Sequence, residues 1–139
     1  MQSIPRKLVM AGIALIALVG LIHAFEAPEY LGEKAYVGVL FILNAVGALV
    51  VAVGIWRGSR AAWGLGILVA AGAFAGYILS RTTGLPGGFK ESGWEPLGIA
   101  SLVIEAAFCL VAARALSASP APAERRTPAR AMGRPVGAR

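Results

Sequence analysis

The chain has 139 residues, of which 58% are hydrophobic and only 14% are charged, whereas roughly a quarter of the residues in a soluble domain carry charge. This length sets a ceiling of one domain, and the charges are clustered between long uncharged runs, which excludes a soluble core under a polar surface. The net charge of +6 does not indicate nucleic acid, because ten of the 13 basic residues flank apolar spans or lie in a C-terminal tail.

The first predicted span covers residues 8–25 and follows the basic pair Arg6 and Lys7. At about 1.5 Å per residue it is long enough to cross a bilayer core of about 30 Å if its ends reach the interface. No small-x-small pair follows the apolar run, so we predict an uncleaved helix and not a signal peptide. The proline at position 28 is expected to end this helix soon after His23.

Three further spans are predicted at residues 36–56, 61–79 and 96–113. Only the short segment 57–60 separates the second from the third, which makes these two helices antiparallel neighbours. Pro96 suits the first turn of a helix, where the missing N–H has no partner to lose. The sequence therefore predicts an all-α, four-helix transmembrane bundle.

The distribution of basic residues predicts the orientation, because Lys and Arg are retained on the cytoplasmic side of membrane spans. Ten basic residues fall on the side of the two termini, and three fall on the other side, at Lys34, Arg81 and Lys90. We predict a multi-pass protein of the bacterial cell membrane with both termini in the cytoplasm. Aromatic residues are expected to mark the inner interface at Trp56 and Trp63 and the outer one at Tyr30, Tyr36 and Trp94.

The composition changes abruptly after Leu116, which divides the chain into a membrane domain of residues 1–116 and a tail of residues 117–139. The tail is rich in Ser, Pro, Ala and Arg and has too little apolar content to fold alone, so we predict disorder. Its five arginines would either bind anionic lipid, at about 1 kcal/mol for each basic residue near the surface, or only enforce topology.

Small residues are expected at helix contacts, because membrane helices associate through close backbone approach. The third span carries Gly72, Gly76 and Ser80 at intervals of four residues, in one line along the helix. This line would serve either packing within the chain or association with a second copy. The expected partners are membrane lipid and either a homo-oligomer or another membrane protein, and no nucleic acid.

Glu105 is the main candidate site residue, because it lies nine residues into the fourth span, near the bilayer centre. An ionised acid there costs roughly 2.5 to 3.5 kcal/mol, so it must face the bundle and be paired, hydrated or protonated. Asn44 lies at nearly the same depth and is its predicted neighbour, which would be hydrogen-bonded to a protonated Glu105 if this residue only joins two helices. Ser101 lies one turn away on the same helix face.

Other polar side chains gather toward the outer ends of the helices and predict a site that opens outward. The predicted proton or ligand site consists of Glu105, Asn44, His23, Arg81, Tyr77 and Ser101. Arg81 would either reach back toward Glu105 or bind an acidic group from outside. The alternatives for Glu105 are a hydrogen bond that only joins two helices, or recognition of a partner helix.

A metal site is a weaker possibility. His23, Glu26 and Glu29 are three residues apart and could share one helix face, but the proline at 28 is expected to interrupt that helix. The single histidine and single cysteine leave too few ligands for haem or a thiolate site. We therefore predict no metal, no cofactor and no catalytic residue, and no nucleophile or phosphate-binding motif is present.

Three segments resemble small four-span membrane proteins of high-GC bacteria that have no assigned function. These are HAFEAPEY at residues 23–30, LSRTTGLP at 79–86 and EPLGIASLVIE at 95–105. In outline the chain also looks like the DoxX-type four-helix proteins, which are associated with oxidoreductase systems, although no motif matches residue by residue. The resemblance implies the four-span topology.

The function predicted from the sequence is binding of a proton, an ion or a small polar ligand in an intramembrane pocket around Glu105, without enzymatic activity. An accessory or assembly subunit of a larger membrane complex is the alternative from another class. A quinone-linked oxidoreductase component is a third, which would require a redox cofactor.

Overall fold

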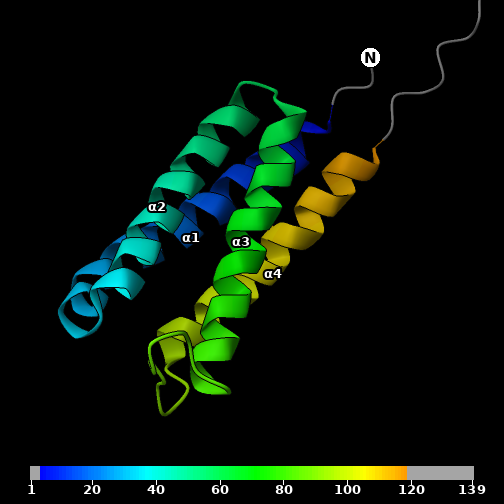
Figure 1. Ribbon diagram of the computed structural model, residues 1–139. Coiled ribbons are helices and arrows are strands. Elements are labelled where there is room, and N and C mark those ends of the chain that lie inside the picture. The colour runs from blue at the N-terminus through cyan, green and yellow to red at the C-terminus, as the bar shows by residue number, and fades with distance from the viewer. Residues whose placement is uncertain (1–3, 119–139) are drawn as a thin grey trace, which may run out of the picture.

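The computed structural model describes residues 4–118 as four α-helices (Figure 1). They are α1 (Arg6–Glu33), α2 (Ala35–Trp56), α3 (Arg60–Arg81) and α4 (Pro96–Ser117). All four are long and apolar enough to cross a membrane, which confirms the prediction of an all-α chain with four candidate spans. The predicted tail from residue 119 onward lies outside the described residues.

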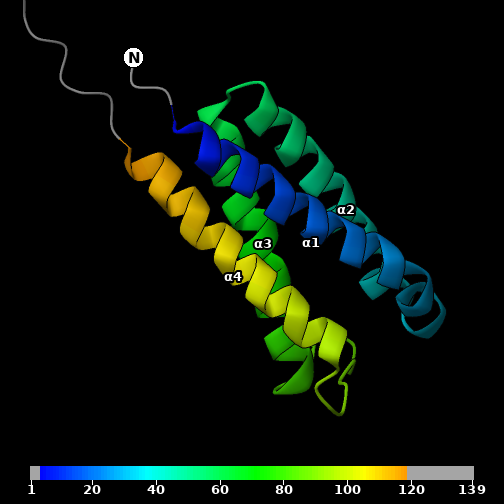
Figure 2. The same ribbon diagram turned by 180° about the vertical axis from the view of Figure 1, so that it is seen from behind.

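The helices are antiparallel neighbours in the cyclic order α1, α2, α3, α4, and α4 closes the ring against α1 (Figures 1 and 2). The backbones of α1 and α3 approach at few points, and over residues 4–118 those of α2 and α4 do not approach closely. We call one end of the bundle the terminal end, because it holds residues 4 and 118 and the α2–α3 turn. The opposite end, with the α1–α2 turn and residues 82–95, is the loop end.

Helix α1 is longer than predicted and continues through Pro28 to Glu33. The prediction that this proline ends the helix was therefore wrong. Proline removes one backbone hydrogen bond, but the residues around it are held by packing. Ala27 and Tyr30 are buried, and the Tyr30 ring stacks on Phe41 of α2 with ring centroids 4.3 Å apart. The other three helices begin within one residue of their predicted starts.

The terminal half of the bundle has a tightly packed apolar core. Trp63 is 1% exposed and its ring stacks on Phe108, with centroids 6.3 Å apart. A Cβ added at Gly12 would collide with the Trp63 ring, so this glycine lets the indole lie directly against α1. Of the two tryptophans expected at the inner interface, Trp56 is 73% exposed, whereas Trp63 lies inside the bundle and not on its surface, contrary to the prediction.

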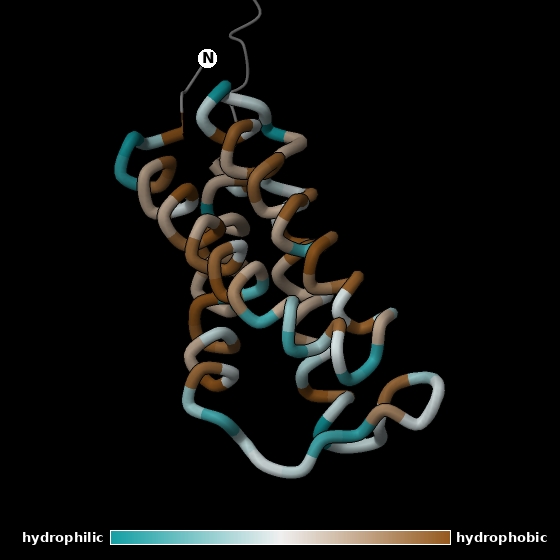
Figure 3. Tube along the Cα trace, turned by 90° about the vertical axis from the view of Figure 1, so that its left-hand side faces the viewer, coloured by the Kyte–Doolittle hydropathy of each residue, from teal (hydrophilic) through white to brown (hydrophobic). Residues whose placement is uncertain are grey.

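Apolar residues predominate along all four helices (Figure 3). Large apolar side chains are exposed on every helix, including Leu21 on α1, Leu49 on α2, Leu68 on α3 and Leu110 on α4. Soluble monomers rarely expose apolar surface of this extent, which fits helices that contact lipid.

Residues 82–95 fold back over the loop end. Leu85 and Phe89 form an isolated antiparallel bridge around a turn with two glycines at positive φ, at positions 87 and 88. Lys34 donates a hydrogen bond of 2.9 Å to the Gly87 carbonyl, and the Tyr36 hydroxyl donates one to the Pro86 carbonyl. The loop is thereby attached to the start of α2, in addition to the two helices that it connects.

Candidate functional site

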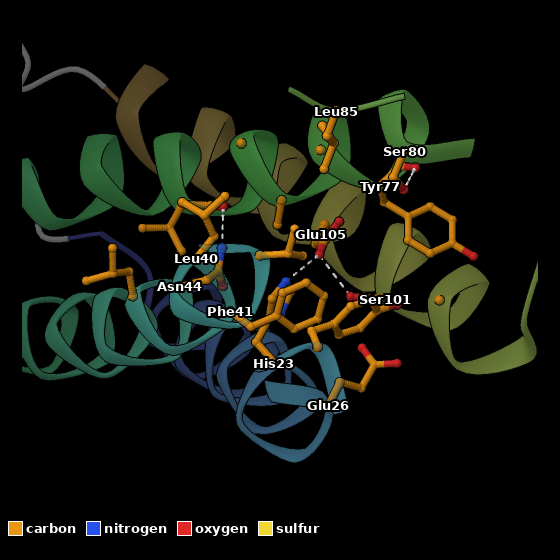
Figure 4. A pocket seen from close by; sticks show the side chains of 18 of the residues that line it. His23, Glu26, Leu40, Phe41, Asn44, Tyr77, Ser80, Leu85, Ser101 and Glu105 are labelled. Atoms are coloured by element: carbon orange, nitrogen blue, oxygen red, sulfur yellow. Dashed lines mark hydrogen bonds and ion pairs between the residues drawn. The ribbon is translucent and has the colours of Figure 1, made fainter. Parts of the chain in front are cut away.

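The loop half of the bundle contains a cavity of about 410 Å³. All four helices and the 82–95 loop contribute to its lining, and most of the lining side chains are apolar (Figure 4). The six residues predicted for the ligand site all line it: His23, Asn44, Tyr77, Arg81, Ser101 and Glu105. The sequence prediction therefore identified residues that the fold brings to one cavity, although several of their partners differ from those expected.

Glu105 lies at the buried wall of the cavity and is only 2% exposed. Ser101, one turn earlier on α4, donates a hydrogen bond of 2.8 Å to Oε1 of Glu105. The second carboxyl oxygen, Oε2, is buried and has no hydrogen-bond partner among residues 4–118. Buried polar atoms are nearly always paired, so this oxygen marks a place where a further donor belongs.

His23 approaches Glu105 from α1 (Figure 4). Its Nδ1 lies 2.9 Å from the Val19 carbonyl, which can only accept, so Nδ1 carries a hydrogen. In the neutral ring this leaves Nε2 as an acceptor, and Nε2 lies 4.0 Å from Oε1 of Glu105. That distance is too long for a direct hydrogen bond. When Glu105 is ionised, two acceptors, one on each residue, therefore stand side by side at the cavity wall.

Asn44 does not pair with Glu105 as predicted. Its Nδ2 donates a hydrogen bond of 3.0 Å to the Val69 carbonyl of α3, while its Oδ1 has no partner in the described part of the chain. Depth along the helix was a poor guide to the partner, because α2 and α4 are diagonal in the ring and Asn44 reaches its neighbour α3 first.

Arg81 does not turn back toward Glu105. Its Nη2 donates to Oε2 of Glu91 at 2.8 Å, and its guanidinium lies over the Tyr77 ring, 3.9 Å from the centroid. Burial raises the pKa of the Glu91 carboxyl above its ordinary value, although the Arg81 charge acts in the opposite direction. The arginine thus fastens the loop to the end of α3.

The loop end of the cavity is covered. Leu85 and Phe89 of the loop line the cavity there, and Phe89 makes an edge contact with the buried Tyr30 ring, 6.1 Å between centroids. Arg81 and its partner Glu91 lie beside them. The loop therefore contributes to the cavity lining at the end of the bundle where the opening was predicted.

The mouth of the cavity lies at its side, between α2 and α3. The lining residues that are exposed are Leu40 and Leu43 on α2, with Leu68 and Gly72 on α3. Leu43 is 60% exposed and Leu68 is 73% exposed. The two helices are joined by a short turn at the terminal end and lie apart in the loop half, where the mouth forms.

The line of small residues on α3 lies along this cavity and not at a helix contact. A Cβ added at Gly72 or Gly76 would meet no atom within 4 Å in the described structure, and Ser80 also lines the cavity. The glycines that do permit close contact are elsewhere, such as Gly66, whose Cβ would collide with Phe108. Sequence spacing alone does not separate these two kinds of glycine.

The possible metal ligands are not assembled. Glu26 lines the cavity with His23, whereas Glu29 belongs to an acidic rim with Glu33, Glu91 and Glu95. Within residues 4–118 no three His, Cys, Asp or Glu side chains are placed to hold a metal ion. The predicted weak metal site at His23, Glu26 and Glu29 therefore has no geometric support.

Comparison with known proteins found no relative, since no family model, curated protein or solved structure matches the chain.

Proposed function

We propose that this protein is a multi-pass protein of the bacterial cell membrane that binds a small ligand inside the bilayer through Glu105. The observation that carries the proposal is the unpaired Oε2 of Glu105, which is buried at the wall of a cavity of about 410 Å³. Ionisable side chains within membrane spans are costly and usually mark ligand sites or proton pathways. Pockets of several hundred Å³ with a few polar groups are typical of small-molecule sites.

The arrangement favours a ligand that donates hydrogen bonds. Oε2 of Glu105 and Nε2 of a neutral His23 are both acceptors, and no described side chain donates to either of them. A hydroxyl, an amine or a hydrated proton would supply the missing donor. Such a bond to an ionised or strongly polar group contributes about 1.5 to 3 kcal/mol.

The proposed orientation places the terminal end in the cytoplasm and the loop end outside. Arg6, Lys7, Arg57, Arg60 and Arg114 lie near the terminal end, whereas the loop end carries the acidic rim of Glu29, Glu33, Glu91 and Glu95. This asymmetry follows the rule that basic residues are retained on the cytoplasmic side.

Native mass spectrometry of the protein released from its own membrane in mild detergent tests the proposed function. We expect a reproducible small adduct on the wild type that is lost in Glu105→Met, which keeps the side-chain length but removes both acceptors. Leu110→Ala, on the exposed face of α4, is the control and should retain the adduct. A stable complex with another membrane protein and no adduct would contradict the proposal and indicate an accessory subunit.

Cysteine labelling tests the orientation. In a background with Cys109→Ala, we expect Glu29→Cys to react with a membrane-impermeant maleimide in intact cells and Arg57→Cys to react only after the membrane is permeabilised. Both positions are exposed in the structure and lie at opposite ends of the bundle. The reverse pattern would contradict the proposed orientation while leaving the cavity unaffected.

A further inference from the structure

We propose that the ligand is a membrane-dissolved amphiphile, with one hydrophobic chain and a head group that donates hydrogen bonds, and that it reaches Glu105 sideways from the bilayer between α2 and α3. This inference rests on the proposed function and adds the class of ligand and its route. It follows from three features of the cavity: where the mouth is, what stands at the buried wall, and what lines the path between them.

The mouth is apolar and faces the region that lipid would occupy. Leu40, Leu43 and Leu68 are exposed at its edges, on the same helix surfaces that carry the other exposed leucines and valines. A charged or strongly polar solute would have to leave water and cross hydrocarbon to reach this opening. A molecule already dissolved in the bilayer would not.

At the loop end, several contacts hold the 82–95 loop against the cavity. Leu85 and Phe89 line the cavity there, Arg81 is bonded to Glu91, and Lys34 is bonded to the Gly87 carbonyl. The backbone N–H of Glu91 also donates to the Ser80 carbonyl at 3.0 Å. The lining residues at this end are buried or half-buried, whereas the fully exposed lining residues lie between α2 and α3.

The wall opposite the mouth specifies the head group. Glu105 is 2% and His23 is 7% exposed, and each presents an acceptor that no residue in 4–118 satisfies by a hydrogen bond at the distances found. The two residues approach one another in Figure 4, with Ser101 holding the other carboxyl oxygen. A single hydroxyl or amine placed here can donate to Glu105, and an amine or a second hydroxyl can also donate to His23.

The path between mouth and wall has room for a chain. Gly72 and Gly76 lie one turn apart on α3 and leave their side of the cavity open, with the leucines of α2 opposite. Glycine is less favourable than alanine within a helix, and here no neighbouring helix requires its small size. An apolar chain lying along these two glycines would make the contacts that a packed helix makes elsewhere in the bundle.

Photolabelling in lipid nanodiscs tests this inference. The probe is a long-chain primary alcohol with a diazirine in mid-chain, and peptide mass spectrometry maps the labelled residues. We expect specific labelling of α3 between Val69 and Tyr77, reduced about tenfold by Glu105→Met, a change equivalent to about 1.4 kcal/mol. The methyl ether of the same alcohol, which cannot donate, should label these residues about as weakly as the alcohol labels the Glu105→Met variant.

A pair of glycine variants tests whether the chain of the probe lies in the cavity along α3. Gly76→Leu places a side chain in the cavity, whereas Gly64→Leu adds the same side chain to α3 outside it, and an added Cβ meets nothing within 4 Å at either position in the described structure. We expect Gly76→Leu to abolish labelling and Gly64→Leu to leave it unchanged, with thermal unfolding showing that both variants fold.

The outcomes distinguish this inference from the proposed function on which it rests. A Glu105-dependent adduct in native mass spectrometry together with labelling that is insensitive to Gly76→Leu would overturn the lateral route and retain the binding function. The absence of both the adduct and the labelling would overturn both proposals. Stronger labelling by the matching long-chain amine than by the alcohol would support the inference and identify the head group as cationic.

Discussion

The two halves of the bundle are built from the same four helices but differ in how the helices meet. In the terminal half, Trp63, Phe108 and Val51 fill the centre and glycines such as Gly66 allow the contacts. In the loop half, the centre is a cavity, its polar atoms are partly unpaired, and Gly72 and Gly76 face open space. One half has the features of a structural core and the other those of a site.

This difference indicates how so small a protein can hold a cavity. Close-packed protein interiors resist deformation, so the terminal half can fix the positions of the helices while the loop half stays open. The loop end is then held by peripheral contacts, chiefly Arg81 with Glu91 and Lys34 with the Gly87 carbonyl, instead of by a filled centre. Stability and function are therefore expected to respond to different residues.

The largest effect on stability is expected at the centre of the terminal half. Trp63→Ala removes a fully buried ring and should lower the free energy of unfolding by about 3 to 5 kcal/mol, because the surrounding helices cannot collapse into the space. Unfolding in mixed micelles with increasing denaturing detergent measures the change. The exposed Trp56→Ala is the control and should change it by no more than about 0.5 kcal/mol. Similar losses for both variants would contradict a packed core.

Two glycines of α3 should respond in opposite ways to the same substitution. Gly66→Ala forces a Cβ against Phe108 and Val51 and should destabilise the protein by about 1 to 3 kcal/mol. Gly76→Ala meets no atom within 4 Å in the described structure and should be neutral or stabilising by up to about 1 kcal/mol, through helix propensity. The same unfolding measurement applies. Equal destabilisation by both would show that the loop half is packed as tightly as the terminal half.

The contact between the loop and α3 should have a smaller, local effect. Arg81→Gln removes the bond to Glu91 and the stacking on Tyr77, so we expect a loss of about 1 kcal/mol and faster hydrogen exchange in residues 82–95. Exchange in α1 and in the terminal half of α3 should stay unchanged. Lys90→Gln is the matched control, because this loop side chain is exposed and makes no hydrogen bond to the helices within residues 4–118. An equal increase in exchange in Lys90→Gln would contradict the role of Arg81.

The smallest effect on stability is expected where the proposed effect on function is largest. Glu105→Met replaces a buried, partly unpaired carboxyl with an apolar side chain of similar length, a change that is often neutral or stabilising. We expect a thermal midpoint in detergent equal to or above that of the wild type. A large destabilisation would show that Glu105 serves mainly to join helices, which is one of the alternative roles predicted for this residue.

The sequence was sufficient for the number, order and approximate limits of the helices, because long uncharged runs leave few other structures available. It was insufficient where the outcome depended on which helices are neighbours. Asn44 and Glu105 do share a depth and a cavity, yet they lie on diagonal helices and do not bond. The contacts of Arg81 and of the loop were not predicted for a related reason. The path of residues 82–95 is set by contacts with the start of α2 that no local sequence pattern encodes.

Aromatic and small residues show the same limit. Trp63 and Trp56 have equal membrane-interface propensity, but only the fold decides that one lies against Gly12 and the other on the surface. Likewise, Gly76 and Gly66 both suit a tight helix contact, and only one of them makes it. These are questions of tertiary neighbours, which propensity and spacing do not determine.

The filled centre of the terminal half has a consequence for the direction of any transport. Trp63, Phe108, Ile16 and Val51 are all almost completely inaccessible there, and the cavity does not extend past them. Under the proposed function, a ligand held at Glu105 would leave by the mouth through which it arrived. A single copy of this chain would then hold, present or sense a membrane solute within one leaflet. Vectorial movement across the bilayer would require a second chain to supply the other half of the path.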